Sequence, residues 1–457
     1  MASDTTELTA VILAAGEGTR MASARPKPLH EVGGRSLLAH AMASAASARP
    51  SRVAVVVGAG GDAVAAAAAA IAPEAEIAEQ KERLGTAHAV LAARATLAAS
   101  PGDAVVLYAD TPFIEADTLA AMRAKRAEGA DVVVLGFRAA DPSGYGRLMT
   151  EGGRLLAIVE ERDADPATRA VDFCNSGVVM ADAATLISLL DEVGCDNAKG
   201  EYYLTDVVSL AARRKLLAAA VECDEAETLG VNSRADLAAA EGAFQARARE
   251  AAMAGGATLV DPATVWFSHD TALGRDVLVE PNVVFGPGVT VEPGATIRAM
   301  SHLEGATVRG GAVVGPFARL RPGAEIGADA RIGNFVEVKN AALGPGAKAN
   351  HLAYIGDADV GAEANVGAGA ITCNYDGVMK HRTVVGAGAF VGTNASLVAP
   401  VTVGEGAYVA SGSVVTRDVP PDALAISRAP QTHKLGFVAR FRSRLLAIKE
   451  KRKKGDA

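Results

Sequence analysis

The second half of the chain carries a six-residue repeat of aliphatic side chains, and this repeat is the feature that most constrains the fold. From residue 279 to residue 415 an aliphatic residue returns at about every sixth position, usually followed by a small or polar residue and a turn-forming pair. One unbroken series is Val314, Leu320, Ile326, Ile332 and Val338. A hexapeptide period of this length is typical of a parallel β-helix, whose stacked coils bury the recurring aliphatic residues. A β-sandwich would instead alternate apolar and polar residues with a period of two.

The first 235 residues follow a different pattern, in which short apolar runs alternate with stretches rich in alanine and leucine. One example is the apolar run at 53–57 followed by the alanine-rich stretch at 63–71. This alternation predicts βαβ units around a mainly parallel sheet, with further buried strands at 104–108 and 131–136. Good helix formers then fill residues 234–253.

These changes of pattern divide the chain into three parts. We expect a first domain at 1–235, a helical linker at 236–256 and a β-helix domain at 257–457. The length of 457 residues, half of them hydrophobic, is sufficient for two packed cores.

Charge and cysteine content narrow the classes of function. The net charge of -8 gives no general affinity for polyanions, and the basic run at 449–454 is expected to be solvated. The four cysteines show no CxxC spacing, which argues against a zinc site and indicates a reducing compartment. The N-terminal segment has acidic residues where a signal peptide needs basic ones. We therefore expect a cytoplasmic protein whose partners include neither nucleic acid nor a membrane.

The loop LAAGEGTRM at 13–21 directly follows an apolar run and suggests a phosphate site. It lacks the third glycine of the dinucleotide fingerprint and the Gly-Lys-Ser/Thr of a P-loop. It does carry Arg20, and Lys27 follows seven residues later. Two cations and several backbone N–H groups at one strand end can neutralise a triphosphate. A solvated basic loop is the alternative interpretation.

Two cations and a histidine suggest a second site within the repeats. Arg321 and Lys339 are 18 residues apart, which is three hexapeptides, so they are predicted to lie on adjacent coils about 5 Å apart. Because like charges at this spacing repel, we interpret the pair as an anion site, with a solvated ladder of charges as the alternative. His351 follows in sequence, and a histidine can accept a proton near neutral pH.

Ordered motifs along nearly the whole chain resemble a known family. In the first half these motifs are LAAGEGTRM, PKPLH, GTAHA, YADTP, GYGR, IVE, NSG, EYYLTD and GVN, and they are similar to those of the sugar-nucleotide pyrophosphorylases. With HLAYIGDA and GAGAITCNYDG in the second half, the chain resembles the bacterial enzymes that join glucosamine-1-phosphate N-acetyltransferase to N-acetylglucosamine-1-phosphate uridylyltransferase. The resemblance implies a Rossmann-like α/β nucleotidyltransferase domain and a left-handed parallel β-helix.

For the first domain the resemblance implies uridylyl transfer, in which a sugar-1-phosphate oxygen attacks the α-phosphate of UTP and pyrophosphate leaves. It implies catalytic roles for Arg20 and Lys27, and Mg²⁺ binding by Asp110 and Asn232. Glu17 departs from the basic or neutral residue common in this loop and is expected to weaken triphosphate binding. The positions that match UTP or UDP-sugar binding are Leu13, Ala14, Ala15, Gly16, Lys27, Gln80, Gly85, Thr86, Tyr108, Asp110, Gly146, Glu160, Asn175, Tyr203, Thr205 and Asn232.

For the β-helix the resemblance implies acetyl transfer from acetyl-CoA to glucosamine-1-phosphate, with His351 as the general base. The positions that match glucosamine-1-phosphate binding are Arg321, Lys339, Tyr354 and Asn365. Those that match binding of acetyl-CoA or its acyl group are Ala368, Asn374, Tyr375, Thr393, Ser411 and Arg428. The insertion at 371–384 is expected to leave the helix as a loop and reach a neighbouring subunit, which predicts a homotrimer.

Two other functions fit parts of the sequence. A single-activity nucleotidyltransferase could use its β-helix only for assembly or regulation, but Arg321, Lys339 and His351 argue against it. A non-catalytic sugar-nucleotide sensor would be expected to lack the metal-binding and base residues, yet Asp110, Asn232 and His351 are all present.

Overall fold

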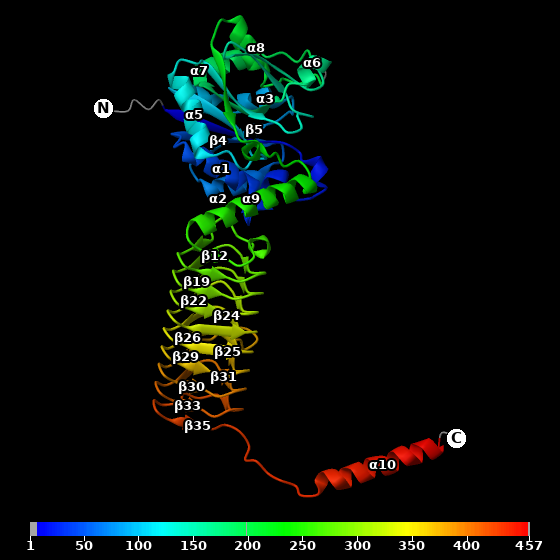
Figure 1. The fold of residues 1–457 in the computed structure, drawn as a ribbon, viewed down its shortest axis with the longest axis vertical. Coiled ribbons are helices and arrows are strands. Elements are labelled where there is room, and N and C mark those ends of the chain that lie inside the picture. The colour runs from blue at the N-terminus through cyan, green and yellow to red at the C-terminus, as the bar shows by residue number, and fades with distance from the viewer. Residues whose placement is uncertain (1–6, 198, 456–457) are drawn as a thin grey trace. The chain divides into compact units, whose positions relative to one another are not determined.

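The computed structural model describes residues 7–197 and 199–455, which form two compact units (Figure 1). The first unit extends to Ala254 and includes Trp266–Thr271, and the second holds the remaining residues from Gly255 onward. Helix α9 (Arg234–Ala254) covers most of the segment predicted as a linker and groups with the first unit. Its Gln245 is buried, and the amide makes hydrogen bonds of 2.7 and 2.8 Å with the backbone of Phe267.

The first unit is built on a mainly parallel sheet, as the sequence predicted. Its main strands, in spatial order, are β11 (Ala218–Cys223), β7 (Val132–Arg138), β10 (Phe173–Asp182), β6 (Asp103–Tyr108), β1 (Leu8–Ala14), β4 (Arg52–Gly58) and β5 (Glu76–Gln80). Strand β10 is antiparallel to both of its neighbours. The hairpin of β8 (Arg147–Glu151) and β9 (Arg154–Val159) pairs with β10, while β2 (Glu31–Val32) and β3 (Arg35–Ser36) pair separately.

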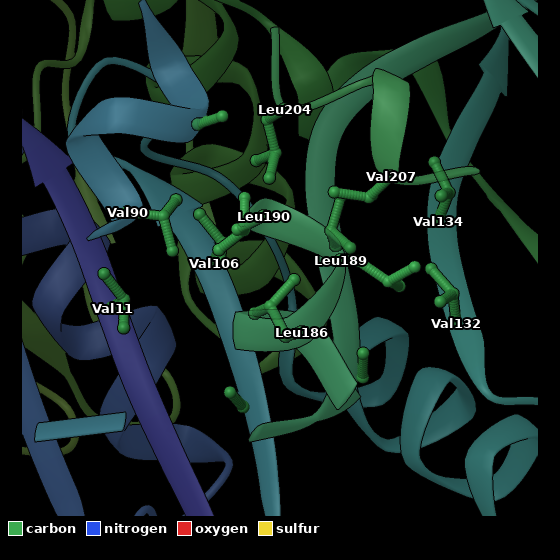
Figure 2. Close-up of a cluster of buried hydrophobic side chains, with 14 of the residues drawn as sticks. Val11, Val90, Val106, Val132, Val134, Leu186, Leu189, Leu190, Leu204 and Val207 are labelled. Atoms are coloured by element: carbon green, nitrogen blue, oxygen red, sulfur yellow. The ribbon is translucent and has the colours of Figure 1, made fainter. Parts of the chain in front are cut away.

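Helices cover both faces of this sheet, which explains why its strands are continuously apolar. On β1, Val11 and Leu13 belong to one buried cluster, drawn in Figure 2, whereas Ala10 and Ile12 belong to the other. The first cluster contains side chains of α3 (Thr86–Ala92), α4 (Arg94–Ala98), α7 (Ala183–Leu190) and α8 (Asp206–Arg213). The second contains side chains of α1 (Leu37–Ser47), α2 (Asp62–Ile71) and α5 (Ala116–Ala127), and the short α6 (Pro166–Arg169) has no buried residue.

The carboxyl ends of β1 and β6 meet at one edge of the sheet. Leu13 is paired with Tyr108, so the glycine loop after β1 lies beside the segment that carries Asp110. The loop continues into two 3-10 helices, η1 (Thr19–Met21) and η2 (Lys27–Leu29). Gly18 has a φ of +63°, and a Cβ there would lie 2.6 Å from the Cβ of Lys27, so only glycine allows this approach.

The second unit is a left-handed parallel β-helix, as predicted. One sheet contains β12 (Thr258–Leu259), β14 (Leu278–Val279), β17 (Thr296–Ile297), β20 (Val313–Val314), β23 (Arg331–Asn334), β25 (Lys348–His351), β27 (Asn365–Val366), β30 (Phe390–Val391), β33 (Tyr408–Val409) and β35 (Leu424–Ala425). A second row contains β13 (Ala272–Leu273), β16 (Thr290–Val291), β19 (Ala306–Val308), β22 (Ala324–Ile326), β24 (Glu337–Leu343), β26 (Tyr354–Val360), β28 (Ile371–Cys373), β31 (Ser396–Val398) and β34 (Val414–Val415). Joined to that row are β15 (Val284–Phe285), β18 (His302–Leu303), β21 (Arg319–Leu320), β29 (Thr383–Val385) and β32 (Val401–Val403).

The strand register explains both the period of six and its slips. Leu320 pairs with Val338, so this coil contains 18 residues, or three hexapeptides. Val291 pairs with Val308, so the coil that contains the slip is one residue shorter. The series Val314, Leu320, Ile326, Ile332 and Val338 is at most 1% exposed, as expected for an inward column.

The predicted insertion is shorter in the structure than the sequence suggested. Residues 371–373 and 383–385 are strands, so the loop that leaves the coil is limited to 374–382. Thr372 is buried, and its hydroxyl makes hydrogen bonds of 2.8 and 2.9 Å with the backbone of Gly356. The prediction was wrong at this edge because a threonine, not an aliphatic residue, takes the inward position.

The chain ends in α10 (Phe437–Gly455), every residue of which is exposed. Across residues 7–197 and 199–455, no helix has both the length and the apolar character needed to cross a bilayer.

The inward column gives a test of what stabilises the coils. Leu320 is fully buried, so Leu320→Ala is expected to lower the free energy of unfolding of the second unit by about 2–5 kcal/mol. Leu424→Ala is the matched control, because Leu424 is 61% exposed, and its effect is expected within about 0.5 kcal/mol. Urea unfolding followed by circular dichroism measures both, and equal losses in the two variants would contradict the assignment.

Candidate functional site

A pocket lies at the carboxyl edge of the first unit's sheet. Most of its walls come from residues that the sequence assigned to nucleotide binding: Leu13, Ala14, Ala15, Gly16, Lys27, Gln80, Gly85, Thr86, Tyr108 and Asp110. The lining also includes Arg83 and Glu201, which the sequence analysis did not select. Arg20 lies in η1 with an exposed side chain and does not line this pocket.

Three of the predicted residues meet at the pocket although they are far apart in the sequence. The Lys27 ammonium donates to Asp110 Oδ2 at 2.5 Å and to Asn232 Oδ1 at 3.1 Å. Lys27 is only 8% exposed, so this contact is largely shielded from water. The segment that carries Asn232 is held in place because the N–H of Val231 donates to the Asp110 carbonyl at 2.8 Å.

The same geometry tests whether the site can hold a cation. Asp110 and Asn232 both direct an oxygen toward one positive charge, the Lys27 ammonium. Carboxylate and amide oxygens are ligands that Mg²⁺ accepts, and Mg²⁺ usually keeps several waters and binds phosphate oxygens as well. Within the described part of the chain, no three His, Cys, Asp or Glu residues gather into a metal-binding group. The donor set therefore fits an ion shared with water and phosphate, and does not form an all-protein cage.

The residues predicted to read the base form a connected layer beside this cluster. Gln80 is buried, and its amide donates to the Gly85 carbonyl at 3.1 Å. The Thr86 hydroxyl accepts from the N–H of Leu204 at 2.9 Å. Burial raises the pKa of Tyr108, and the nearby charge of Asp110 acts in the same direction. Tyr108 is therefore a neutral wall of the pocket at physiological pH.

The residues predicted to bind the sugar form a second group in the same unit. The Asn175 N–H donates to the Gly146 carbonyl at 2.8 Å, and the Thr205 hydroxyl donates to Glu160 Oε1 at 3.3 Å. A Cβ added to Gly146 would lie 3.5 Å from the Glu160 carboxylate. Burial raises the pKa of Glu160, and it also raises the pKa of Tyr203, to which the charge of Glu160 adds. The structure therefore brings all five residues together.

Arg83 changes the expectation for Glu17. The Arg83 guanidinium forms an ion pair with the Glu17 carboxylate and donates through Nε to the Ala15 carbonyl at 3.3 Å. The negative charge in the glycine loop is therefore compensated within the protein. Sequence reasoning did not find this pair because its partners are 66 residues apart.

In the β-helix, the register of Arg321 and Lys339 is the predicted one, but the charges are arranged differently. Each cation directly follows an inward residue of the paired column, and Arg321 Nη1 donates to Glu337 Oε1 at 2.9 Å. The predicted repulsion between Arg321 and Lys339 is thus relieved on one side by Glu337. The close like charge of Lys339 is instead Lys380 in the 374–382 loop, because the Lys339 side chain lowers the pKa of Lys380.

Asp357 lies between these lysines and the predicted acyl-site residues. Burial raises its pKa, but hydrogen bonds from Asn340 and Asn374, together with the charges of Lys339 and Lys380, lower the pKa overall. The Asn340 amide donates to Asp357 at 2.6 Å, and the Asn374 amide donates to its other oxygen. One buried carboxylate therefore orients two amides and lies near two ammonium groups. Lys380 and Asp357 were not selected from the sequence.

His351 and Tyr354 approach the same region from neighbouring strands. His351 is exposed, and its Nδ1 lies 2.6 Å from Asn334 Oδ1 on the preceding coil. Because an amide oxygen only accepts, this contact places the proton on Nδ1 and leaves Nε2 free to accept one. The Asn374 amide donates to the Tyr354 hydroxyl at 3.5 Å, which joins Tyr354 to the Asp357 group.

The predicted coenzyme residues occupy equivalent positions on successive coils. Val366 pairs with Val391, and Val391 pairs with Val409. Two residues beyond these three valines the chain has Ala368, Thr393 and Ser411. Arg428 Nη1 donates to the Ser411 carbonyl at 2.9 Å, Asn365 lies on β27, and Tyr375 is 60% exposed in the loop.

The two halves of the chain match different protein-family models. The MobA-like NTP transferase domain matches residues 10–229, and the bacterial transferase hexapeptide (six repeats) matches residues 382–417. With the geometry above, these matches define a nucleotidyltransferase joined to a hexapeptide-repeat transferase.

Full-length relatives narrow this class to one family. The chain is 57% identical over 447 residues to the bifunctional protein GlmU of Jannaschia sp. (strain CCS1), with 98% of each chain covered. It is 60% identical over 436 residues to that of Azorhizobium caulinodans, covering 95% of this chain and 97% of the relative. For Bradyrhizobium sp. (strain ORS 278) the identity is 53% over 433 residues, with 95% and 97% covered. The chain belongs to the family of bifunctional GlmU proteins, which are nucleotidyltransferases and N-acetyltransferases of UDP-N-acetylglucosamine synthesis.

Two adjacent glutamates allow a paired test of the sugar-side environment. Because burial raises the pKa of Glu160, the folded state keeps this proton to higher pH than the unfolded state, and the contribution of Glu160 to stability falls as pH rises past the usual glutamate range. The hydrogen bond from Arg147 lowers the pKa of Glu161, so its stabilising contribution is present at neutral pH and is lost as the pH falls through the lowered value.

We therefore expect opposite pH profiles for the two glutamine variants. From pH 4 to pH 7, Glu160→Gln is expected to become more stable relative to the unsubstituted protein, and Glu161→Gln less stable. Urea unfolding across this range measures both differences. Profiles of the same sign would show that the two carboxylates do not have the environments described.

Proposed function

We propose that the two reactions of UDP-N-acetylglucosamine synthesis are divided between the two units. In the second unit, acetyl-CoA acetylates glucosamine-1-phosphate and free coenzyme A leaves. In the first unit, N-acetylglucosamine-1-phosphate then reacts with UTP, and pyrophosphate leaves. The observation that carries the first assignment is the meeting of Lys27, Asp110 and Asn232 at the mouth of parallel strands.

Uridylyl transfer needs positioning and charge neutralisation, not a protein nucleophile. A phosphate oxygen of the sugar phosphate attacks the α-phosphorus of UTP, and the bond to the pyrophosphate oxygen breaks. The Lys27 ammonium and the Arg20 guanidinium offset the negative charge that develops on pyrophosphate. Gln80 and the backbone of Gly85 hold the base, since an amide can match both a donor and an acceptor.

We assign Mg²⁺ to Asp110 and Asn232 in this reaction. When bound, the ion neutralises phosphate charge and fixes the phosphate geometry. Lys27 already holds these two oxygens together, so the protein presents the pair as an ordered set of donors.

Acetyl transfer requires a neutral amine, and His351 is placed to provide it. Its Nε2 accepts a proton from the glucosamine ammonium or amine, and the nitrogen lone pair attacks the thioester carbonyl carbon. The carbon–sulfur bond then breaks, and the coenzyme A thiolate takes up a proton. Arg321 and Lys339, with Lys380 as an additional cation, hold the sugar phosphate, and Tyr354 and Asn365 line the sugar.

Acetyl-CoA is assigned to the edge defined by equivalent positions on successive coils. Ala368, Thr393 and Ser411 supply small side chains along this edge, and Arg428 faces a coenzyme phosphate. Asn374 and Tyr375 are assigned to the acyl group. The 374–382 loop also exposes Val378 and Met379, at 86% and 59%, which supports a subunit contact there. We therefore propose a homotrimer that acts in the cytoplasm.

Crossed variants test the division of labour. His351→Ala is expected to slow acetyl transfer by about 10²- to 10⁴-fold and to leave uridylyl transfer unchanged when pre-acetylated sugar phosphate is supplied. Asp110→Asn is expected to slow uridylyl transfer by about 10²-fold or more and to leave acetyl transfer unchanged. Release of coenzyme A thiol and release of pyrophosphate measure the two steps separately.

Matched controls use the same residue types outside the sites. His302→Ala removes an exposed histidine from β18, and Asp117→Asn removes an acid from the first turn of α5. Both are expected to leave the two rates unchanged. If His351→Ala retained full acetyl transfer, the β-helix assignment would be wrong whatever the first unit does.

Chelation separates the two reactions in a different way. Removing divalent cations with EDTA is expected to abolish uridylyl transfer, because the phosphate charges lose their counterion, and to leave acetyl transfer intact. Added Mg²⁺ is expected to restore the first activity. Loss of both activities on chelation would contradict the assignment of the metal to Asp110 and Asn232 alone.

A further inference from the structure

The C-terminal helix α10 is basic and has no buried residue. Between Phe437 and Gly455 it contains eight lysines and arginines but one glutamate, in a chain whose net charge is -8. The sequence analysis treated the run at 449–454 as a solvated tail. In the structure this run is the last turn and a half of a helix that begins twelve residues earlier.

The added residues give the helix an apolar stripe. Phe437, Phe441, Leu445 and Ile448 are spaced by four, four and three residues, so they lie on one face at about 100° per residue. The rings of Phe437 and Phe441 are stacked with centroids 5.7 Å apart, which shows that these side chains lie along the same line. All four side chains are 42–49% exposed.

Cations border this stripe on both sides. At the same angular spacing, Arg440, Arg444 and Lys451 fall along one edge of the stripe. Along the other edge the helix has Arg442 and Lys449. Long basic side chains at the edges of an apolar face can extend their charged ends toward anionic headgroups while their stems cover apolar surface.

We propose that α10 binds the surface of an anionic lipid bilayer and lies in its plane. The apolar stripe enters the boundary of the acyl chains, and the two cationic edges contact the headgroup phosphates. The helix is too polar to cross the bilayer, in agreement with the absence of a spanning helix among the described residues. This proposal departs from the expectation that no membrane is a partner.

Other occupants of the stripe fit the charges less well. If two copies of α10 packed stripe against stripe, the cationic edges of one helix would face those of the other and repel. A nucleic acid would satisfy the cations through its phosphates but would leave the stacked phenylalanines without an apolar partner. An anionic membrane accommodates both features of the same face.

The test is sedimentation of the full-length protein with vesicles. We expect binding to vesicles of equal parts phosphatidylglycerol and phosphatidylcholine, weakening with added salt, and little binding to phosphatidylcholine alone. The double variant Phe441→Ser, Leu445→Ser is expected to lower the partition coefficient by about tenfold or more, because two apolar anchors are lost. Leu446→Ser is the matched control, since Leu446 is equally apolar and 60% exposed but lies off the stripe.

Three results would overturn the proposal. The first is absence of binding to the anionic vesicles. The second is undiminished binding by the double variant, which would make α10 a general polyanion binder. The third is a lipid-free change in oligomeric state of the double variant, measured by light scattering, which would assign the stripe to a second copy of the chain. Circular dichroism of each variant checks that the helix remains formed.

Discussion

Parallel strand pairing is the constraint on which both units depend, because its register decides which distant residues become neighbours. In the first unit, pairing of β1 with β6 places the glycine loop beside the segment of Asp110. In the second unit, pairing of each coil with the next converts a separation of 17 or 18 residues into one strand spacing. Residues that are remote in the chain are therefore brought together by backbone hydrogen bonds before any side chain contributes.

The positive charges of the two candidate sites are held in different ways. Lys27 is enclosed by two oxygen donors, so its position is well defined before substrate arrives. Arg321 has a carboxylate partner in Glu337, whereas Lys339 and Lys380 lie near each other and share only the neighbouring charge of Asp357. An arriving phosphate would therefore relieve more repulsion at the lysine pair than at Arg321.

Much of the fold could be predicted from the sequence because the relevant signals are local and periodic. The inward column from Val314 to Val338 and the strands at 104–108 and 131–136 follow directly from apolar spacing. The features that could not be predicted depend on side chains from separate segments. Arg83 reaches Glu17, Lys380 approaches Lys339, and Thr372 replaces an aliphatic residue by satisfying its hydroxyl with the backbone of Gly356. No local pattern announces these contacts.

The small side chains of Ala368, Thr393 and Ser411 have a consequence for the evolution of this unit. They recur at the same place on three consecutive coils, and neighbouring strands are about 4.8 Å apart. An elongated ligand that lies along this edge is thus measured in whole coils, as if against a ruler with one fixed interval. Duplication or loss of a single coil would change the accommodated length by one such interval while the cross-section of the unit stayed the same. Selectivity for long ligands can therefore change in steps, without redesign of the inward column.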